Sequence, residues 1–232
     1  MANEVKHPEE KNPPIQPTHH AHGGGAEQFW QKNSKIILYA LAAIILIVGG
    51  YFIYQSQFKA PGEQKAADAM WKAEDYFRKD SARLALNGDG PNAGFLKIIS
   101  RHSGTKAANL AKFYAASSYI KLGDFKNAIK YLKDFETDDK LIMVRATGLL
   151  GDAYAETGKK NEAIEQYKKA GTLFPDDNFN SPEYLFRAGL LYQDLGKNKE
   201  AIEMFKIIKD KYHSTERGAE IDKYLARLGE IE

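Results

Sequence analysis

The sequence predicts an all-α protein in which a single transmembrane helix precedes a superhelix of helical hairpins. Two observations predict this class. Between Lys35 and Lys59 the chain has no charged residue. Beyond Lys59, a set of glycine, alanine and aromatic residues recurs roughly every 35 residues, which is typical of stacked helical repeats. No run of alternating β-branched residues competes with these helical patterns.

The charge-free stretch predicts a transmembrane helix over residues 35–58. A spanning helix needs roughly 20 apolar residues, and the 19 residues from Ile36 to Tyr54 carry no polar group except tyrosine hydroxyls. A buried core helix would show a polar stripe, which is missing here. Aromatic residues near both ends fit the two headgroup regions of a bilayer. No small-residue cleavage site follows directly, so we expect an uncleaved anchor and no signal peptide.

Residues 1–34 are expected to form a disordered tail, because they contain four prolines and three consecutive glycines and few apolar residues offset the ordering entropy. The tail contains His19, His20 and His22. These side chains are able to bind a metal ion, but nothing nearby fixes a ligand geometry, so a polar linker is the favoured interpretation.

The orientation of the anchor is only weakly indicated. Lys32 and Lys35 precede the span and Lys59 and Lys65 follow it, so the positive charges are nearly balanced. A short tail before the span and a large domain after it favour a cytoplasmic N-terminus.

Three aligned segments define the repeat: 119–132, 154–167 and 192–205. Each has a glycine where a helix should end, since glycine adopts the left-handed cap without steric cost. Each also has an alanine where two antiparallel helices can approach closely. The alanines are 35 and 38 residues apart, close to the tetratricopeptide period of about 34. These residues are Gly123, Gly158 and Gly196, and Ala128, Ala163 and Ala201.

We therefore predict a tetratricopeptide-repeat domain over residues 59–232, separated from the anchor by the breaker residues 60–62. Repeats are expected at about 105–137, 140–175 and 182–213. A degenerate first hairpin is expected over 63–102, with one long helix from about Glu63 to about Leu86 and with Ala93 at the small-residue position. A capping helix is expected over 215–229, because repeat arrays shield their terminal apolar faces.

Composition and motifs argue against several functions. The chain has no cysteine, which excludes disulfides, thiolate metal sites and cysteine nucleophiles. A net charge of +2 gives no case for a nucleic-acid binder. The glycine-rich segment 88–94 follows a predicted helix, so a turn is favoured over a phosphate loop. The acidic pair Asp176 and Asp177 is interpreted as solvated turn residues. We predict no catalytic site, no metal site and no cofactor, and we expect the protein not to be an enzyme.

Function is then expected on a surface. The first helix of each hairpin in this fold lines a concave groove, although some of its side chains alternatively pack between repeats. The candidate partner-binding residues are Leu110, Phe113, Ser117 and Ile120 in the first repeat, Arg145, Leu149 and Asp152 in the second, and Phe186, Leu190 and Gln193 in the third.

The groove is expected to be apolar. Some tetratricopeptide proteins hold a terminal carboxylate with Lys and Asn on these helices. The corresponding pairs here are Phe113/Ser117, Gly148/Asp152 and Phe186/Leu190, which argues against that mode. A hydrophobic stretch or a partner helix suits such a groove better.

The order of tail, anchor and small repeat domain resembles the YfgM-like proteins, which are ancillary subunits of the bacterial Sec translocon. The most specific part is residues 84–119, which contain Leu-Ala-Leu-Asn-Gly-Asp-Gly, Gly-Phe-Leu-Lys-Ile-Ile and Gly-Thr-Lys-Ala-Ala-Asn. This block is similar to the version in Bacteroidota-type bacteria. The resemblance implies an inner-membrane protein with a periplasmic repeat domain, beside the SecYEG channel and a membrane-anchored peptidyl-prolyl isomerase-like chaperone. It carries over no catalytic residues.

Two hypotheses follow. The first is a non-enzymatic, chaperone-like accessory of protein transport that binds translocon subunits, the partner chaperone or exported polypeptides. The alternative is a structural adaptor for cell-envelope or outer-membrane assembly complexes.

Overall fold

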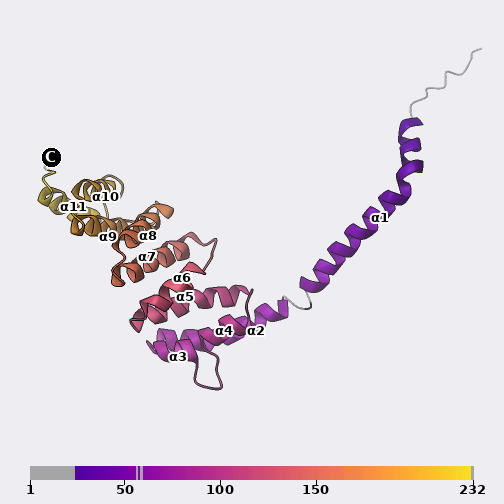
Figure 1. Ribbon diagram of the computed structural model, residues 1–232, viewed down its shortest axis with the longest axis horizontal. Helices are drawn as coiled ribbons and strands as arrows, with labels where there is room; N and C mark the ends of the chain where they lie inside the picture. Colours follow the sequence, from indigo (N-terminus) through magenta and orange to yellow (C-terminus); the bar gives the residue numbers. More distant parts are fainter. Residues whose placement is uncertain (1–23, 56, 58–59, 231–232) are drawn as a thin grey trace, which may run out of the picture. The chain divides into compact units, whose positions relative to one another are not determined.

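The computed structural model describes residues 24–55, 57 and 60–230 (Figure 1). Eleven helices occur in these ranges, and their only extended pairing is an isolated bridge between Gly88 and Ala93. The predicted all-α class is therefore confirmed. The chain divides after Tyr54 into two compact units.

The first unit contains α1, Gly24–Tyr54. Within the described residues, its part from Phe29 to Tyr54 is the one helix long and apolar enough to cross a membrane, and none of it is buried. The helix begins 11 residues before the predicted anchor, so residues 24–34 are helical and not a disordered tail. The last proline before the span is Pro17, and the residues from Ala26 onward tolerate a helix. The rest of the predicted tail, with its histidines, lies outside the described residues.

The second unit contains three regular hairpins. The first consists of α5, Lys106–Lys121, and α6, Phe125–Lys133. The second consists of α7, Lys140–Glu156, and α8, Lys160–Leu173. The third consists of α9, Asn180–Asp194, and α10, Asn198–Lys211, and α11, Glu216–Arg227, follows it. The helix α9 begins two residues before the predicted start of the third repeat.

The turn inside each hairpin has the same geometry. Gly123, Gly158 and Gly196 have φ angles of 74°, 76° and 71°, a region that side chains with a Cβ avoid. In each turn, the N–H of the following residue donates to the carbonyl of the tyrosine four residues before the glycine, at 2.8–2.9 Å. The repeated glycine and tyrosine therefore end one helix and aim the next back along it.

Small residues hold the two helices of a hairpin close together. Ala128, Ala163 and Ala201 are fully buried. A Cβ atom on Gly151 would lie 2.6 Å from the ring of Tyr167, so only glycine leaves room for that ring. A Cβ atom on Gly189 would likewise overlap the ring of Phe205, so the second and third hairpins depend on a small residue facing an aromatic one.

The degenerate first unit differs from its prediction. The expected long helix is divided into α2, Ala60–Arg78, and α3, Ala82–Asn87. The break lies at Asp80, whose φ of 58° is incompatible with a continuous helix. The predicted breaker residues 60–62 instead form the first turn of α2, where a proline is tolerated because its missing N–H has no partner to lose.

The small-residue position of this unit was also assigned wrongly. Ala93 pairs with Gly88 and precedes α4, Phe95–Arg101. Ile98 lies four residues after the N-cap of α4, as Ala128 does after the N-cap of α6, and it is fully buried. A large residue thus occupies the position that holds alanine in the regular repeats.

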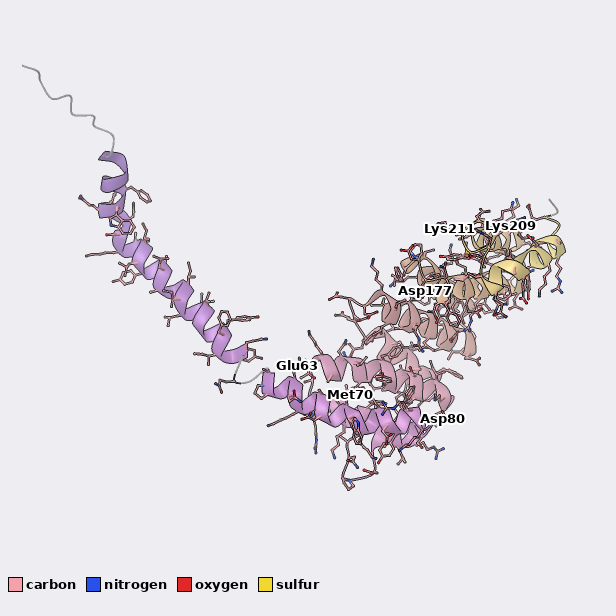
Figure 2. The ribbon with its side chains drawn as sticks, turned by 180° about the vertical axis from the view of Figure 1, so that it is seen from behind. Glu63, Met70, Asp80, Asp177, Lys209 and Lys211 are labelled. Atoms are coloured by element: carbon pink, nitrogen blue, oxygen red, sulfur yellow. The ribbon has the colours of Figure 1, made fainter. Side chains whose placement is uncertain are left out.

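The helix α2 runs parallel to α5, as the first helices of successive repeats do. Figure 2 labels Glu63 near the start of α2 and Asp80 just beyond its end. The Glu63 carboxylate accepts the backbone N–H of Lys106 at 2.9 Å, and Asp80 lies 2.5 Å from Lys121 Nζ. Contacts at both ends therefore hold the two helices side by side.

Candidate partner-binding face

The first helices of the repeats form one continuous surface. In this unit α2 contacts α5, α5 contacts α7, α7 contacts α9, and α9 contacts α11. In the described part of the chain, by contrast, no contact joins α4 to α6, α6 to α8 or α8 to α10. The first helices of successive repeats therefore lie closer together than the second helices do. A row of repeats curves toward its more closely packed side, so the first helices line the concave side. We call the solvent-facing surface of α5, α7 and α9 the inner face.

The part of the inner face on α5 is largely apolar. Leu110, Phe113 and Ile120 are half-buried, and Ser117 bonds its hydroxyl to the Phe113 carbonyl at 2.9 Å. The Phe113 ring lies 5.6 Å from that of Phe135, so it packs between repeats as well as facing outward. Phe113 therefore packs between repeats and is also partly exposed, whereas the partner-binding role of these four residues stays a prediction.

A hollow of about 520 Å³ lies at the start of α5 and α7. Leu110, Phe135 and Ile142 contribute apolar side chains to it. Acidic side chains of the loop between α6 and α7, which include Asp138, also line it. An apolar side chain of a partner has space here beside Leu110.

The apolar surface continues along α7. Leu149 is half-buried against the core cluster that Phe113 also contacts, which consists of Ala116, Leu132, Phe135 and Ala146. Leu141 is 50% exposed at the start of the helix. Arg145 is exposed between these two leucines, one helical turn from each. The predicted Arg145 and Leu149 therefore lie together on the inner face.

The structure corrects the assignment of Phe186. This side chain is only 5% exposed, because α11 covers it. Its ring meets that of Tyr224 edge-on at 4.7 Å, and the Arg217 guanidinium lies 4.1 Å from its centre. Phe186 is therefore a core residue of the capped end. Leu190, 38% exposed, and Gln193, half-buried, remain at the surface of α9.

Asp152 belongs to a group that we call the ion-pair network: Asp152, Tyr167, Glu183, Arg187 and Arg217. The Asp152 carboxylate accepts the Tyr167 hydroxyl and Nη1 of Arg187, each at 2.6 Å. Arg187 Nε donates to Glu183 at 3.0 Å, and Arg217 Nη2 donates to the same carboxylate at 2.6 Å. The network links α7, α8, α9 and α11, so this half of the inner face is ionic and not apolar as predicted.

Four members of this network are not among the predicted site residues. The spacing of Glu183 and Arg187 indicates an ion pair within one helix. The contacts that join α7, α9 and α11 depend on helix packing, for which the sequence has no signal.

Burial and charge set the protonation of the network. Burial and the hydrogen bond to Asp152 raise the pKa of Tyr167 above its ordinary range. Burial, with the nearby Asp152 charge, raises the pKa of Tyr184 to about 12. Burial alone would lower the pKa of Arg187, but the Asp152 and Glu183 carboxylates outweigh it and raise that pKa. Near neutral pH the tyrosines are therefore neutral and Arg187 is charged.

Two loop assignments can be compared with the structure. The segment 88–94 is a turn in which Asp89 accepts the Tyr76 hydroxyl at 2.5 Å, a bond that lowers the pKa of Asp89 to about 2. Asp177 is not a solvated turn residue: it is 7% exposed and accepts the backbone N–H groups of Phe179 and Asn180 at the start of α9.

Across the described residues, no cluster of three or more His, Cys, Asp or Glu side chains is suited to a metal ion.

Comparison with known families agrees with this architecture. The family described as tetratricopeptide repeat-like domain matches residues 27–141, and tetratricopeptide repeat families match residues 144–177 and 183–213. The chain is a tetratricopeptide-repeat protein. The first match begins inside α1, so the apolar helix and the first repeat units lie in one family domain. No curated protein matches the chain. Tetratricopeptide repeats are scaffolds for protein–protein interaction, which makes the inner face the candidate functional site.

Proposed function

We propose that this protein is a membrane-anchored, non-enzymatic accessory of the Sec protein-translocation machinery. In this proposal the inner face binds translocon subunits, a partner chaperone or exported polypeptides as they emerge. The observation that carries the proposal is a partly exposed apolar surface on α5 and α7 in a chain that also has a candidate membrane span.

The chemistry of α5 and α7 supports an unfolded or helical polypeptide as the ligand. Phe113 and Leu149 pack against a core cluster but are only half-buried, and Leu141 is half exposed, so apolar side chains also meet solvent. An apolar stretch of a partner would remove this surface from water, which stabilises a complex in proportion to the area buried. Exported chains present such stretches before they fold.

The proposed location is the bacterial inner membrane, with a cytoplasmic N-terminus and a periplasmic repeat domain. Support comes from the length and hydropathy of α1, from the large domain that follows it, and from the resemblance to YfgM-like proteins. A reporter fused to each end of the chain tests this topology. Activity of a periplasm-specific reporter at the N-terminus would contradict it.

Site-specific photo-crosslinking in living cells tests the partner. A crosslinking amino acid at Phe113 or Leu149 should yield adducts with SecYEG subunits, a membrane-anchored chaperone or exported chains, identified by mass spectrometry. The matched control is Lys126, which is exposed on α6, outside the inner face. Adducts at Phe113 and Leu149 that contain only cytosolic proteins would refute the proposal.

The alternative is a structural adaptor for envelope or outer-membrane assembly complexes. The same experiment separates the two functions, because the adaptor would crosslink at the inner face to folded envelope-assembly proteins. Arrest of protein export would then leave the adduct pattern unchanged, whereas it should enrich exported chains if the proposed function is right.

A further inference from the structure

Arg145 is a charged side chain in an apolar setting. It lies on α7 between Leu141 and Leu149, one turn from each, and it is exposed. The half-buried groove residues Phe113 and Ile120 pack in the same cluster as Leu149. Any partner that covers the leucines therefore also covers the guanidinium group.

The two carboxylates of the ion-pair network on the inner face are already paired. Asp152 accepts hydrogen bonds from Arg187 and Tyr167, and Glu183 accepts them from Arg187 and Arg217. For Arg145 itself, the described residues contain no ion pair within 4.0 Å.

Two tyrosine hydroxyls also lie within reach of the Arg145 charge. Its charge acts on the hydroxyl groups of Tyr114 on α5 and Tyr184 on α9, so it lies between those two helices on the inner face. Both tyrosines have raised pKa values, chiefly because they are buried, and so they stay neutral. They provide no countercharge for the guanidinium. The Glu74 carboxylate on α2 also acts on the Tyr114 hydroxyl, but its ion pair is with Arg78, at 3.9 Å.

Covering an unpaired cation with apolar groups is costly. A buried charge loses its hydration and is tolerated in proteins only when it is paired and hydrogen-bonded. Arginine pairs best with a carboxylate, which accepts two parallel N–H bonds. A wholly apolar segment would thus leave Arg145 desolvated without a partner.

We propose that the inner face recognises an apolar polypeptide segment that carries an acidic side chain among its apolar ones, and that Arg145 pairs with that side chain. This inference rests on the proposed function and specifies the chemistry of the segment. Leu149, Leu141 and Phe113 then contact the apolar residues on either side of the acidic one. Arg145 acts as the selectivity residue.

Synthetic peptides and the full chain in phosphatidylcholine nanodiscs test this assignment. Three fluorescent amphipathic peptides share one leucine-rich sequence and differ only at a central Glu, Gln or Lys; acetylated and amidated ends remove the terminal charges. By fluorescence anisotropy, the Glu peptide should bind the wild-type protein about tenfold more tightly than the Gln peptide, as expected for a charge-assisted hydrogen bond.

Variants assign the preference to one residue. Arg145→Gln should abolish the difference between the Glu and Gln peptides, and Arg145→Glu should reverse it in favour of the Lys peptide. The matched control is Arg83→Gln, because Arg83 is exposed on α3, away from the inner face. It should keep the wild-type preference.

Several outcomes would overturn the inference. Equal binding of the Glu and Gln peptides to the wild type, or an unchanged preference in Arg145→Gln, excludes Arg145 as the selectivity residue. If crosslinking at Phe113 nevertheless captures exported chains, the proposed function stands without this refinement. Absence of both peptide binding and crosslinking overturns both. Binding of phosphatidylglycerol vesicles that requires Arg145, without peptide binding, would assign the residue to lipid headgroups and also reject the inference.

Discussion

Phe113 and Phe186 occupy the same position of the first and third repeats, yet their environments differ. Each lies three residues before the small residue of its helix, Ala116 or Gly189. Phe113 is half-buried and faces outward beside Phe135. Phe186 is 5% exposed beneath Tyr224 of α11. The repeat period decides which face a residue is on, and the neighbouring element decides whether that face stays open.

The two halves of the inner face differ in the same way. On α5 and α7 the surface is apolar and partly open, with Arg145 unpaired in the described structure. Towards α9 and α11 the ion-pair network joins α7, α9 and α11 to one another. One half is therefore suited to a partner, and the other half stabilises the end of the array.

The largest expected effect separates the two phenylalanines. Phe186→Ala should lower the free energy of unfolding by about 3–5 kcal/mol, because it leaves a cavity in a buried core. Phe113→Ala should cost clearly less, since its ring is already half exposed, but should weaken crosslinking to partners. Chemical denaturation of both variants in mild detergent measures the difference. Equal losses of stability would show that the two positions are equivalent.

The ion-pair network should contribute less. Glu183→Gln removes the carboxylate that two arginines share and should cost about 1–2 kcal/mol in low salt, with a smaller loss in high salt. The control is Glu220→Gln. Glu220 pairs with Arg217 and Lys223 of its own helix, and its side chain is about 40% exposed. Such pairs are worth at most about 0.5 kcal/mol. A loss at Glu183 no larger than that at Glu220 would mean that the network does not hold α9 against α11.

Alkaline pH should destabilise the packing around Tyr184 and Tyr167. The pKa of Tyr184 is about 12 in the folded chain, against 10.0 for an ordinary tyrosine. A raised pKa favours the neutral form, so this stability is fully present below pH 10 and is lost as the pH rises from 10 towards 12. Tyr167→Phe should reduce the loss, because it removes a second tyrosine with a raised pKa. Thermal unfolding across this range measures the effect, and a constant midpoint would contradict it.

The smallest effect on stability is expected at Arg145. Arg145→Gln should change the free energy of unfolding by less than about 0.5 kcal/mol, as is usual for exposed residues without a structural partner. Its effect should appear in partner selectivity alone. A large destabilisation would show that Arg145 has a structural role that the described contacts do not contain.

Local residue chemistry made part of this structure predictable. Glycine caps, buried alanines and facing aromatic rings act within one hairpin, so the sequence indicates three hairpins and the surface that Leu110, Phe113 and Leu149 share. Other features depend on distant contacts. The cover over Phe186, the pairing of Asp152 with Arg187, and Ile98 at the position assigned to Ala93 arise from packing between elements. The start of α1 at Gly24 was missed because glycines and a polar composition mask a helix that continues from the apolar span.

Photo-crosslinking during arrested export tests the central claim most directly. A crosslinking amino acid is placed at Leu149 on α7 or at Glu165, which is exposed on α8 of the same hairpin. An exported chain is then stalled in the translocon of intact cells. The account predicts adducts between the stalled chain or SecYEG and position 149, with little or none at position 165. Equal adducts at both positions, or adducts at 165 alone, would contradict a partner site on the inner face.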